Sequence, residues 1–169
     1  MKSNLWGKTI LTVYKYLERI AGSIDKLVER QALNSYYSGF KNDGVLDLAD
    51  KIIELSERKV KLINVKVLTE KALEKMEEVS AQLLIEKYID GDKGEVIAER
   101  HNFPMRTYFR RQLQAEDAFC AYLALLGFSE EKLNKYLSGE NWIVEVYNNF
   151  KTKELNEITV FMDEKVANF

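Results

Sequence analysis

The spacing of apolar residues constrains the fold of this chain more than any other feature, because it alternates between three and four residues over most of the first half. The first series is Ile10, Val13, Leu17, Ile20, Ile24 and Leu27. The second is Val45, Leu48, Ile52, Leu55, Leu62, Val65, Thr69, Ala72, Met76, Val79 and Leu83. This alternation places side chains along one stripe of an α-helix. It therefore predicts two long helices with an apolar seam, over residues 8–33 and 45–78.

The second series is irregular at two points. Lys59 stands at one seam position, and the phase shifts by a short step at Leu62. Such a shift predicts a bend or a change of packing partner. Turn-forming residues crowd the stretch 34–44 between the two helices, which permits a hairpin. We expect Tyr36, Tyr37 and Phe40 to form a hydrophobic cap over its end.

Two architectures fit this arm. The two helices fold back on each other as a hairpin, or the longer helix pairs with its copy in a homodimer. We favour a hairpin that also dimerises through these N-terminal helices, because the second helix is long enough to leave part of its apolar stripe uncovered. The alternative is an ordinary monomeric helical core.

Composition fits an all-α protein that is soluble and cytoplasmic. The 169 residues are 46% hydrophobic and 31% charged, with a single proline and a single cysteine. Cys120 cannot form an intrachain disulfide and is expected in the core, as in a reducing compartment. The longest apolar run, 118–128, is too short to span a bilayer, and the charged N-terminal residues argue against a signal peptide.

Residues 83–111 predict a helix, a tight turn and a second helix. Ala98 is small enough for a second helix to cross closely, and Asn102 tolerates the left-handed conformation that the turn needs. Phe103 is expected to fill the corner between the helices. Pro104 suits the first position of the second helix. This pattern is typical of a helix-turn-helix that enters the major groove of DNA.

The second helix should present arginines outward. If Tyr108 faces the core, steps of 100° per residue put Ala115 and Phe119 on its side and Arg106 and Arg110 on the opposite side. Arginine reads guanine or binds phosphate, and the alternative is an ordinary solvated face. The predicted DNA-binding residues are His101, Met105, Arg106, Thr107, Phe109, Arg110, Arg111 and Gln114.

These residues carry a family resemblance. Residues 83–119 resemble region 4 of the bacterial sigma-70 factors, and the run Arg-Thr-Tyr-Phe-Arg-Arg at 106–111 resembles phage and prophage transcriptional regulators of the ArpU and RinA type. The segment 88–91 and the helical opening at 16–20 are similar in layout. Gln112 departs from the pattern, because sigma factors usually carry an apolar residue there.

The resemblance implies a fold and partners. It implies an all-α protein with a long N-terminal helical arm, residues 1–79, a sigma-like helix-turn-helix domain, residues 80–127, and a small helical C-terminal extension, residues 128–169. It also implies binding to double-stranded promoter DNA and contact with RNA polymerase. No segment resembles the region that melts promoters, so the resemblance implies a regulator or a sigma-like accessory factor and not a complete sigma factor.

Charge is distributed unevenly along the chain. Residues 92–115 carry 5 Lys and Arg against 3 Asp and Glu, whereas residues 116–169 carry 5 against 10. A locally basic helix-turn-helix is compatible with DNA binding through a small patch. We expect the acidic tail to dock on a basic surface, either the DNA-reading helix or a polymerase subunit. Residues 142–147 and 158–161 could form short strands or an amphipathic helix.

Nothing in the sequence favours an enzyme. His101 is the only histidine and is expected in the exposed turn, near phosphate or solvent. One histidine and one cysteine cannot form a soft-ligand zinc site within a single chain, and there is no glycine-rich phosphate loop. No cofactor or metal is predicted. The alternative to a DNA-binding regulator is a helical protein-interaction module that keeps the helix-turn-helix as a packing unit.

Overall fold

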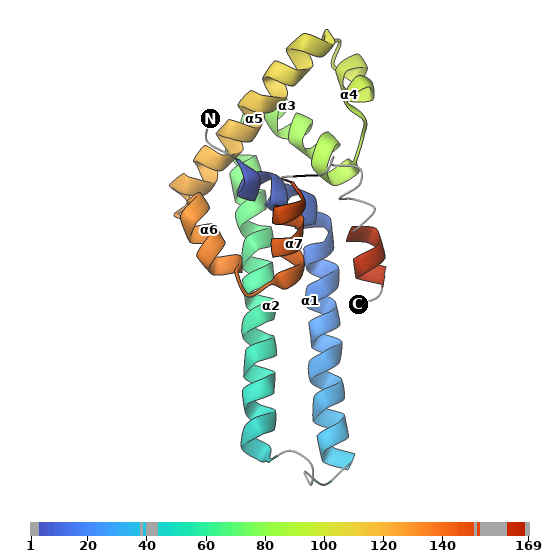
Figure 1. Cartoon of the computed structure of the whole chain (residues 1–169), viewed down its shortest axis with the longest axis vertical. Coiled ribbons are helices and arrows are strands. Elements are labelled where there is room, and N and C mark those ends of the chain that lie inside the picture. Colours follow the sequence, from blue (N-terminus) through green and yellow to red (C-terminus); the bar gives the residue numbers. More distant parts are fainter. Residues whose placement is uncertain (1–3, 38, 40–43, 151, 153–161, 168–169) are drawn as a thin grey trace.

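The computed structural model describes residues 4–37, 39, 44–150, 152 and 162–167, and this part of the chain is all-α (Figure 1). The predicted fold class is confirmed. The helices are α1 (Leu5–Tyr37), α2 (Val45–Glu74), α3 (Glu78–Leu84), the π-helix η1 (Ile85–Asp90), α4 (Gly94–Arg100), α5 (Met105–Leu125), α6 (Glu130–Leu137) and α7 (Asn141–Asn149), followed by a helical turn at 162–167.

The two long helices form the predicted hairpin. α1 and α2 run antiparallel, and the C-terminal end of α1 lies beside the start of α2 at one extreme of the molecule (Figure 1). The seam residues Ile10 to Ile24 of α1 are buried in one core cluster with Leu62, Val65 and Leu68 of α2. Lys59 is tolerated at the seam because its Nζ lies 2.7 Å from Oδ1 of Asp25 on α1.

The phase shift at Leu62 corresponds to a change of packing partner. The last turns of α2 pack against α5 as well as α1, so the buried stripe moves round the helix to Leu68 and Ala72. The helix itself continues to Glu74. We call the predicted helix-turn-helix segment, residues 80–127, the head. Its helix α5 is thus anchored on the upper part of the hairpin.

The predicted cap at the hairpin end is wrong for two of its three residues. Tyr36 and Tyr37 are 71% and 81% exposed, and they contact each other edge to face with ring centroids 5.7 Å apart. They lie at the end of α1, beside the start of α2 and away from the helices α3 to α7 (Figure 1). Phe40 lies outside the described residues.

The C-terminal extension is helical where it is described. Residues 142–147 belong to α7, whose Trp142, Ile143 and Val146 are buried in the main core. Trp6 of α1 stacks on Tyr147 with ring centroids 4.5 Å apart. Ile158, Val160 and Phe161, for which a strand or a helix was predicted, lie outside the described residues.

The described tail helices α6 and α7 pack on the hairpin, and among the described residues none of their acidic side chains pairs with Arg106, Arg110 or Arg111. Docking of this part of the tail on the DNA-reading face of α5 is therefore wrong, and docking on a polymerase subunit stays a prediction. α6 and α7 contact α1, and Glu140 accepts hydrogen bonds from Arg58 Nε on α2 at 2.9 Å and from Trp142 Nε1 at 3.0 Å. Figure 1 shows both helices away from the first turns of α5. The acidic side chain of Glu140 thus has a structural partner within the chain.

The main core joins residues from all three predicted segments. Leu17 of the arm, Phe119 of the head and Met162 of the tail are all in it and fully buried or nearly so. The segment boundary at 79/80 falls inside α3. The division into three domains stays a prediction. In the described part of the chain, none of the helices has the length and apolar character needed to cross a membrane.

Candidate nucleic-acid interface

A tight turn joins α4 to α5. Asn102 has a φ of 54°, the left-handed conformation predicted for it, and its N–H donates to the carbonyl of Glu99 at 3.0 Å. The N–H of Phe103 donates to the carbonyl of Ala98 at 2.8 Å. Asparagine tolerates this conformation better than other non-glycine residues. The turn therefore closes α4 within three residues and redirects the chain into α5.

Pro104 lies one residue earlier than predicted. It caps α5 with an extended ψ of 144°, and the first helical residue is Met105. Its carbonyl accepts the N–H of Tyr108 at 2.9 Å. Proline is compatible with this place because the N–H groups at the start of a helix have no intrahelical acceptor.

A small second core fixes the crossing of α4 and α5. Leu83, Ile97, Ala98 and Tyr108 are buried together, and Phe103 and Met105 pack against them. The position predicted for Phe103, in the corner between the helices, is confirmed. A Cβ on Gly94 would lie 3.0 Å from the ring of Tyr108, so the two helices approach closely.

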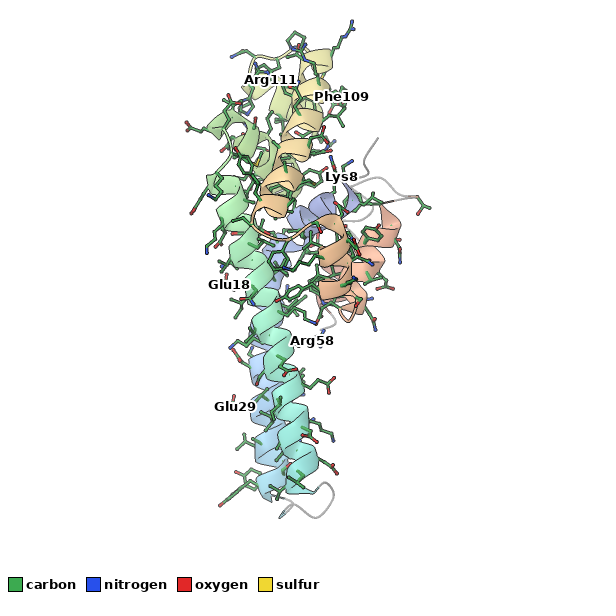
Figure 2. All side chains as sticks on the ribbon, turned by 90° about the vertical axis from the view of Figure 1, so that its left-hand side faces the viewer. Lys8, Glu18, Glu29, Arg58, Phe109 and Arg111 are labelled. Carbon is green, nitrogen blue, oxygen red and sulfur yellow. The ribbon has the colours of Figure 1, made fainter. Side chains whose placement is uncertain are left out.

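Arg106 and Arg110 lie on the outer face of α5, one turn apart. Both are exposed, whereas Tyr108 between them is 2% exposed. Among the described residues, neither guanidinium takes part in an ion pair or a hydrogen bond. The predicted outward orientation is confirmed, and DNA binding by these residues stays a prediction. This face lies at the end of the molecule opposite the C-terminal end of α1, where Figure 2 labels Phe109 and Arg111.

The other predicted contact residues differ in accessibility. Phe109 is 58% exposed and Gln114 is exposed, whereas Met105 and Thr107 are half-buried. Arg111 is also half-buried, and its guanidinium carbon lies 4.7 Å from the ring centroid of Phe103. This cation–π contact agrees with the prediction that the stem of Arg111 packs towards the inner side.

The prediction that His101 is an exposed turn residue is wrong. Its side chain is 17% exposed, and its Nε2 lies 2.9 Å from Oε2 of Glu86 on η1. Its ring also stacks on Phe103 with centroids 5.6 Å apart. An exposed turn residue free to contact phosphate was expected, but the histidine is held by a buried carboxylate.

Glu86 ties the end of α4 to η1. Besides His101, it accepts from Gln82 at 3.2 Å and pairs with Arg100, whose Nη1 is 2.9 Å from Oε1. Arg100 also reaches Asp92 at 2.9 Å. Burial alone would raise the pKa of Glu86, but the hydrogen bonds from Arg100, Gln82 and His101 hold the pKa below its usual value. The ionised carboxylate thus anchors the helix that precedes the turn.

Glu116 is a second buried carboxylate and ties α5 to two other elements. Its side chain is 3% exposed, with Lys8 of α1 at 3.3 Å and Lys87 of η1 at 3.2 Å. Tyr88 OH donates to it at 2.7 Å, and Gln112 Nε2 lies 3.4 Å away. Burial would raise the pKa of Glu116, but the charge of Lys87, the hydrogen bond from Tyr88 and the charge of Lys8 lower it below its usual value.

Sequence reasoning missed Glu86 and Glu116. For Glu116 a signal was present, because Tyr108, Gln112 and Glu116 are spaced by four and therefore share the inner side of α5. Gln112 was interpreted only as a departure from the sigma pattern. It is 2% exposed, and its Oε1 has no hydrogen-bond partner in the described structure.

The described residues hold no cluster of three or more His, Cys, Asp or Glu side chains arranged to bind a metal ion. Comparison of the chain with models of protein families, with curated proteins and with solved structures found no match. The residues themselves therefore carry the interpretation of this surface.

Proposed function

We propose that this protein is a sequence-specific DNA-binding regulator of transcription that reads the major groove with the first two turns of α5. The observation that carries the proposal is the pair Arg106 and Arg110, which are exposed on one face of a helix whose opposite side is buried. Neither arginine has an ion-pair or hydrogen-bond partner within the part of the chain that the structure describes. Retaining two uncompensated cations on a rigid surface is consistent with an anionic partner.

The chemistry of this face suits DNA. An arginine can donate two hydrogen bonds to guanine O6 and N7, and an exposed apolar side chain such as Phe109 can contact a thymine methyl group. Gln114 would lie beside the groove, where its amide can contact a base or a phosphate. Arg111, held against Phe103, is placed to contact phosphate and not a base.

We further propose a phage, prophage or bacterial promoter as the target and RNA polymerase as a second partner, as the resemblance to sigma region 4 implies. A single head offers few phosphate contacts, because residues 92–115 carry a net charge of only +2. Affinity depends on the number of such contacts. A homodimer through the N-terminal helices would double them.

One observation favours a second function, a protein-interaction module. Val96, Phe109 and Leu113 are 45%, 58% and 49% exposed. Apolar side chains on an exposed helix face are typical of protein interfaces. In this case α5 would bind a protein groove, and the arginines would lie at the polar rim.

The test selects bound fragments from a random duplex library at about 50 mM salt, and then compares Arg106→Ala and Arg110→Ala with Arg30→Ala. Arg30 is an exposed arginine on α1, far from the head, and serves as a matched control. Each head variant should weaken specific binding by about 1–3 kcal/mol, roughly 5- to 150-fold, and relax selection at one base pair. Arg30→Ala should bind as the unmodified chain does.

Two outcomes would count against DNA binding. No enrichment of any duplex at low salt would leave the protein-interaction module as the better function. Equal binding by all three variants would show that the affinity comes from elsewhere on the molecule.

A further inference from the structure

The outer face of α2 carries an apolar seam that α1 does not cover. Leu46, Ile53, Val60 and Val67 recur every seven residues, with Ile63 beside them, and these five side chains are between 39% and 80% exposed. Leu62, which is buried against α1, is nine residues after Ile53 and so half a turn away from it. We call these five residues the α2 outer seam. It runs for about 30 Å along the helix axis.

Figure 2 faces this side of the molecule. α2 lies in front of α1, and below α6 no other described helix covers it. At the level of α6, a groove of about 380 Å³ lies beside the seam, with Ile53, Val60 and Tyr136 among its walls. A seven-residue apolar repeat along an open helix is the pattern by which one helix packs against another. The groove offers space for an apolar side chain from such a helix.

The charges of α2 indicate which helix fits. Residues 45–57 carry four acidic residues and one basic residue, whereas residues 58–71 carry five basic residues and one acidic residue. The side chains beside the seam change from acidic to basic along the helix: Asp50, Glu54 and Glu57 come first, and Lys61 and Lys71 follow. A second copy of α2 that runs in the opposite direction would therefore offer a basic half to the acidic half of the first copy, and an acidic half to its basic half.

We propose that the α2 outer seam binds the same seam of a second copy of this chain, with the two α2 helices antiparallel. In this orientation the acidic half of each helix lies against the basic half of the other, and the two-fold axis passes near Ser56 and Glu57. A parallel pair would bring halves of like charge together, which is unfavourable. The two heads then lie at opposite ends of the dimer.

This antiparallel pairing depends on the homodimer that is part of the proposed function, but it does not depend on the protein binding DNA. Sedimentation equilibrium of the full chain between about 1 and 100 µM should show a monomer–dimer equilibrium. Val60→Lys and Ile53→Lys should each raise the dimer Kd at least tenfold, which corresponds to about 1.4 kcal/mol. Leu125→Lys is the matched control, because Leu125 is an exposed leucine on α5, outside the seam. Circular dichroism checks that each variant is folded.

Charge reversal tests the complementarity. Glu54→Lys should weaken the dimer, because position 54 of one copy lies near Lys61 of the other in this register. The double variant with Lys61→Glu should recover affinity, because the reversed charges again oppose each other between the two copies. The two residues are seven apart and lie on the same flank of α2, so the test does not depend on a local pair within one helix.

A spin label at position 47, introduced by Asp47→Cys in a Cys120→Ala background, reports the orientation. An antiparallel dimer places the two labels on the order of 30 Å apart, whereas a parallel dimer places them about 10–15 Å apart. A monomer at 100 µM, a dimer unaffected by Val60→Lys, or the shorter label distance would each overturn the proposal. A monomer that binds specific DNA would overturn this proposal alone, and a dimer that binds no DNA would overturn the DNA-binding function alone.

Discussion

Glu116 should be the most sensitive single position for the stability of the head. In Glu116→Ala the hydroxyl of Tyr88, a residue that is 5% exposed, loses its carboxylate acceptor. The Nε2 of Gln112 loses its acceptor as well. A hydrogen bond to a charged group contributes about 1.5–3 kcal/mol. Lys8 and Lys87 are about 30% exposed and can turn to water, so their ion pairs add less than about 1 kcal/mol. The expected loss is about 2–4 kcal/mol.

Urea unfolding at pH 7, followed by circular dichroism, measures this loss. Glu116→Gln should lose about 1–2 kcal/mol, because an amide oxygen still accepts from Tyr88 but the charge is gone. Glu99→Ala, which removes an exposed glutamate of α4, is the control and should leave the midpoint unchanged.

Acid titration tests the charge separately. The folded pKa of Glu116 is lowered, so its contribution is present above the unfolded pKa of about 4.3 and is lost as the pH falls through the folded pKa. The unmodified chain should therefore lose more stability than Glu116→Gln as the pH falls below about 4.3. A Glu116→Ala variant within 0.5 kcal/mol of the unmodified chain at pH 7 would refute the structural role of this carboxylate.

Two further predictions concern the backbone. Asn102→Gly should leave the stability nearly unchanged, and Asn102→Val should lower it by about 1–2 kcal/mol, because only the valine is strained at a φ of 54°; equal unfolding midpoints would contradict this. Gly7→Ala should cost about 1–3 kcal/mol, because its Cβ would overlap Cys120 Sγ where α1 crosses α5, and adding Cys120→Ala should recover much of that loss. Gly22 lies on the same helix, but a Cβ there would meet open space, so Gly22→Ala should stabilise the protein by up to about 1 kcal/mol. If Gly22→Ala also destabilises the protein, the loss in Gly7→Ala cannot be assigned to the crossing of α1 and α5. Thermal or urea unfolding measures all of these variants.

The sequence predicted the elements that depend on local periodicity or local chemistry. The hairpin seam of α1 follows from the apolar spacing of Ile10 to Ile24, and the turn follows from the tolerance of Asn102 for the left-handed conformation. The inward position of Tyr108 then fixed the outward position of the arginines, because a helix has one period throughout.

What the sequence could not predict depends on contacts between distant segments. His101 looked like an exposed turn residue because its partner Glu86 is fifteen positions away, on a π-helix that no periodicity indicated. Tyr36 and Tyr37 looked like a cap because aromatic residues are usually buried, but both are exposed at the end of α1, and α3 to α7 pack against the other end of the hairpin. The tail was ambiguous because apolar segments as short as 142–147 and 158–161 fit a strand as well as a helix.

The continuity of α5 has a consequence for how such a protein can evolve. One unbroken helix carries Arg106 in its first turn and Phe119 in the main core, so the azimuth of the arginines is set by the packing of a distant part of the molecule. Insertion of a single residue between Gln112 and Ala115 would rotate the face that carries Arg106 and Arg110 by about 100° relative to that core. Changes in the chemistry of this face should therefore arise by replacement of outward side chains, and α5 should not tolerate changes of length.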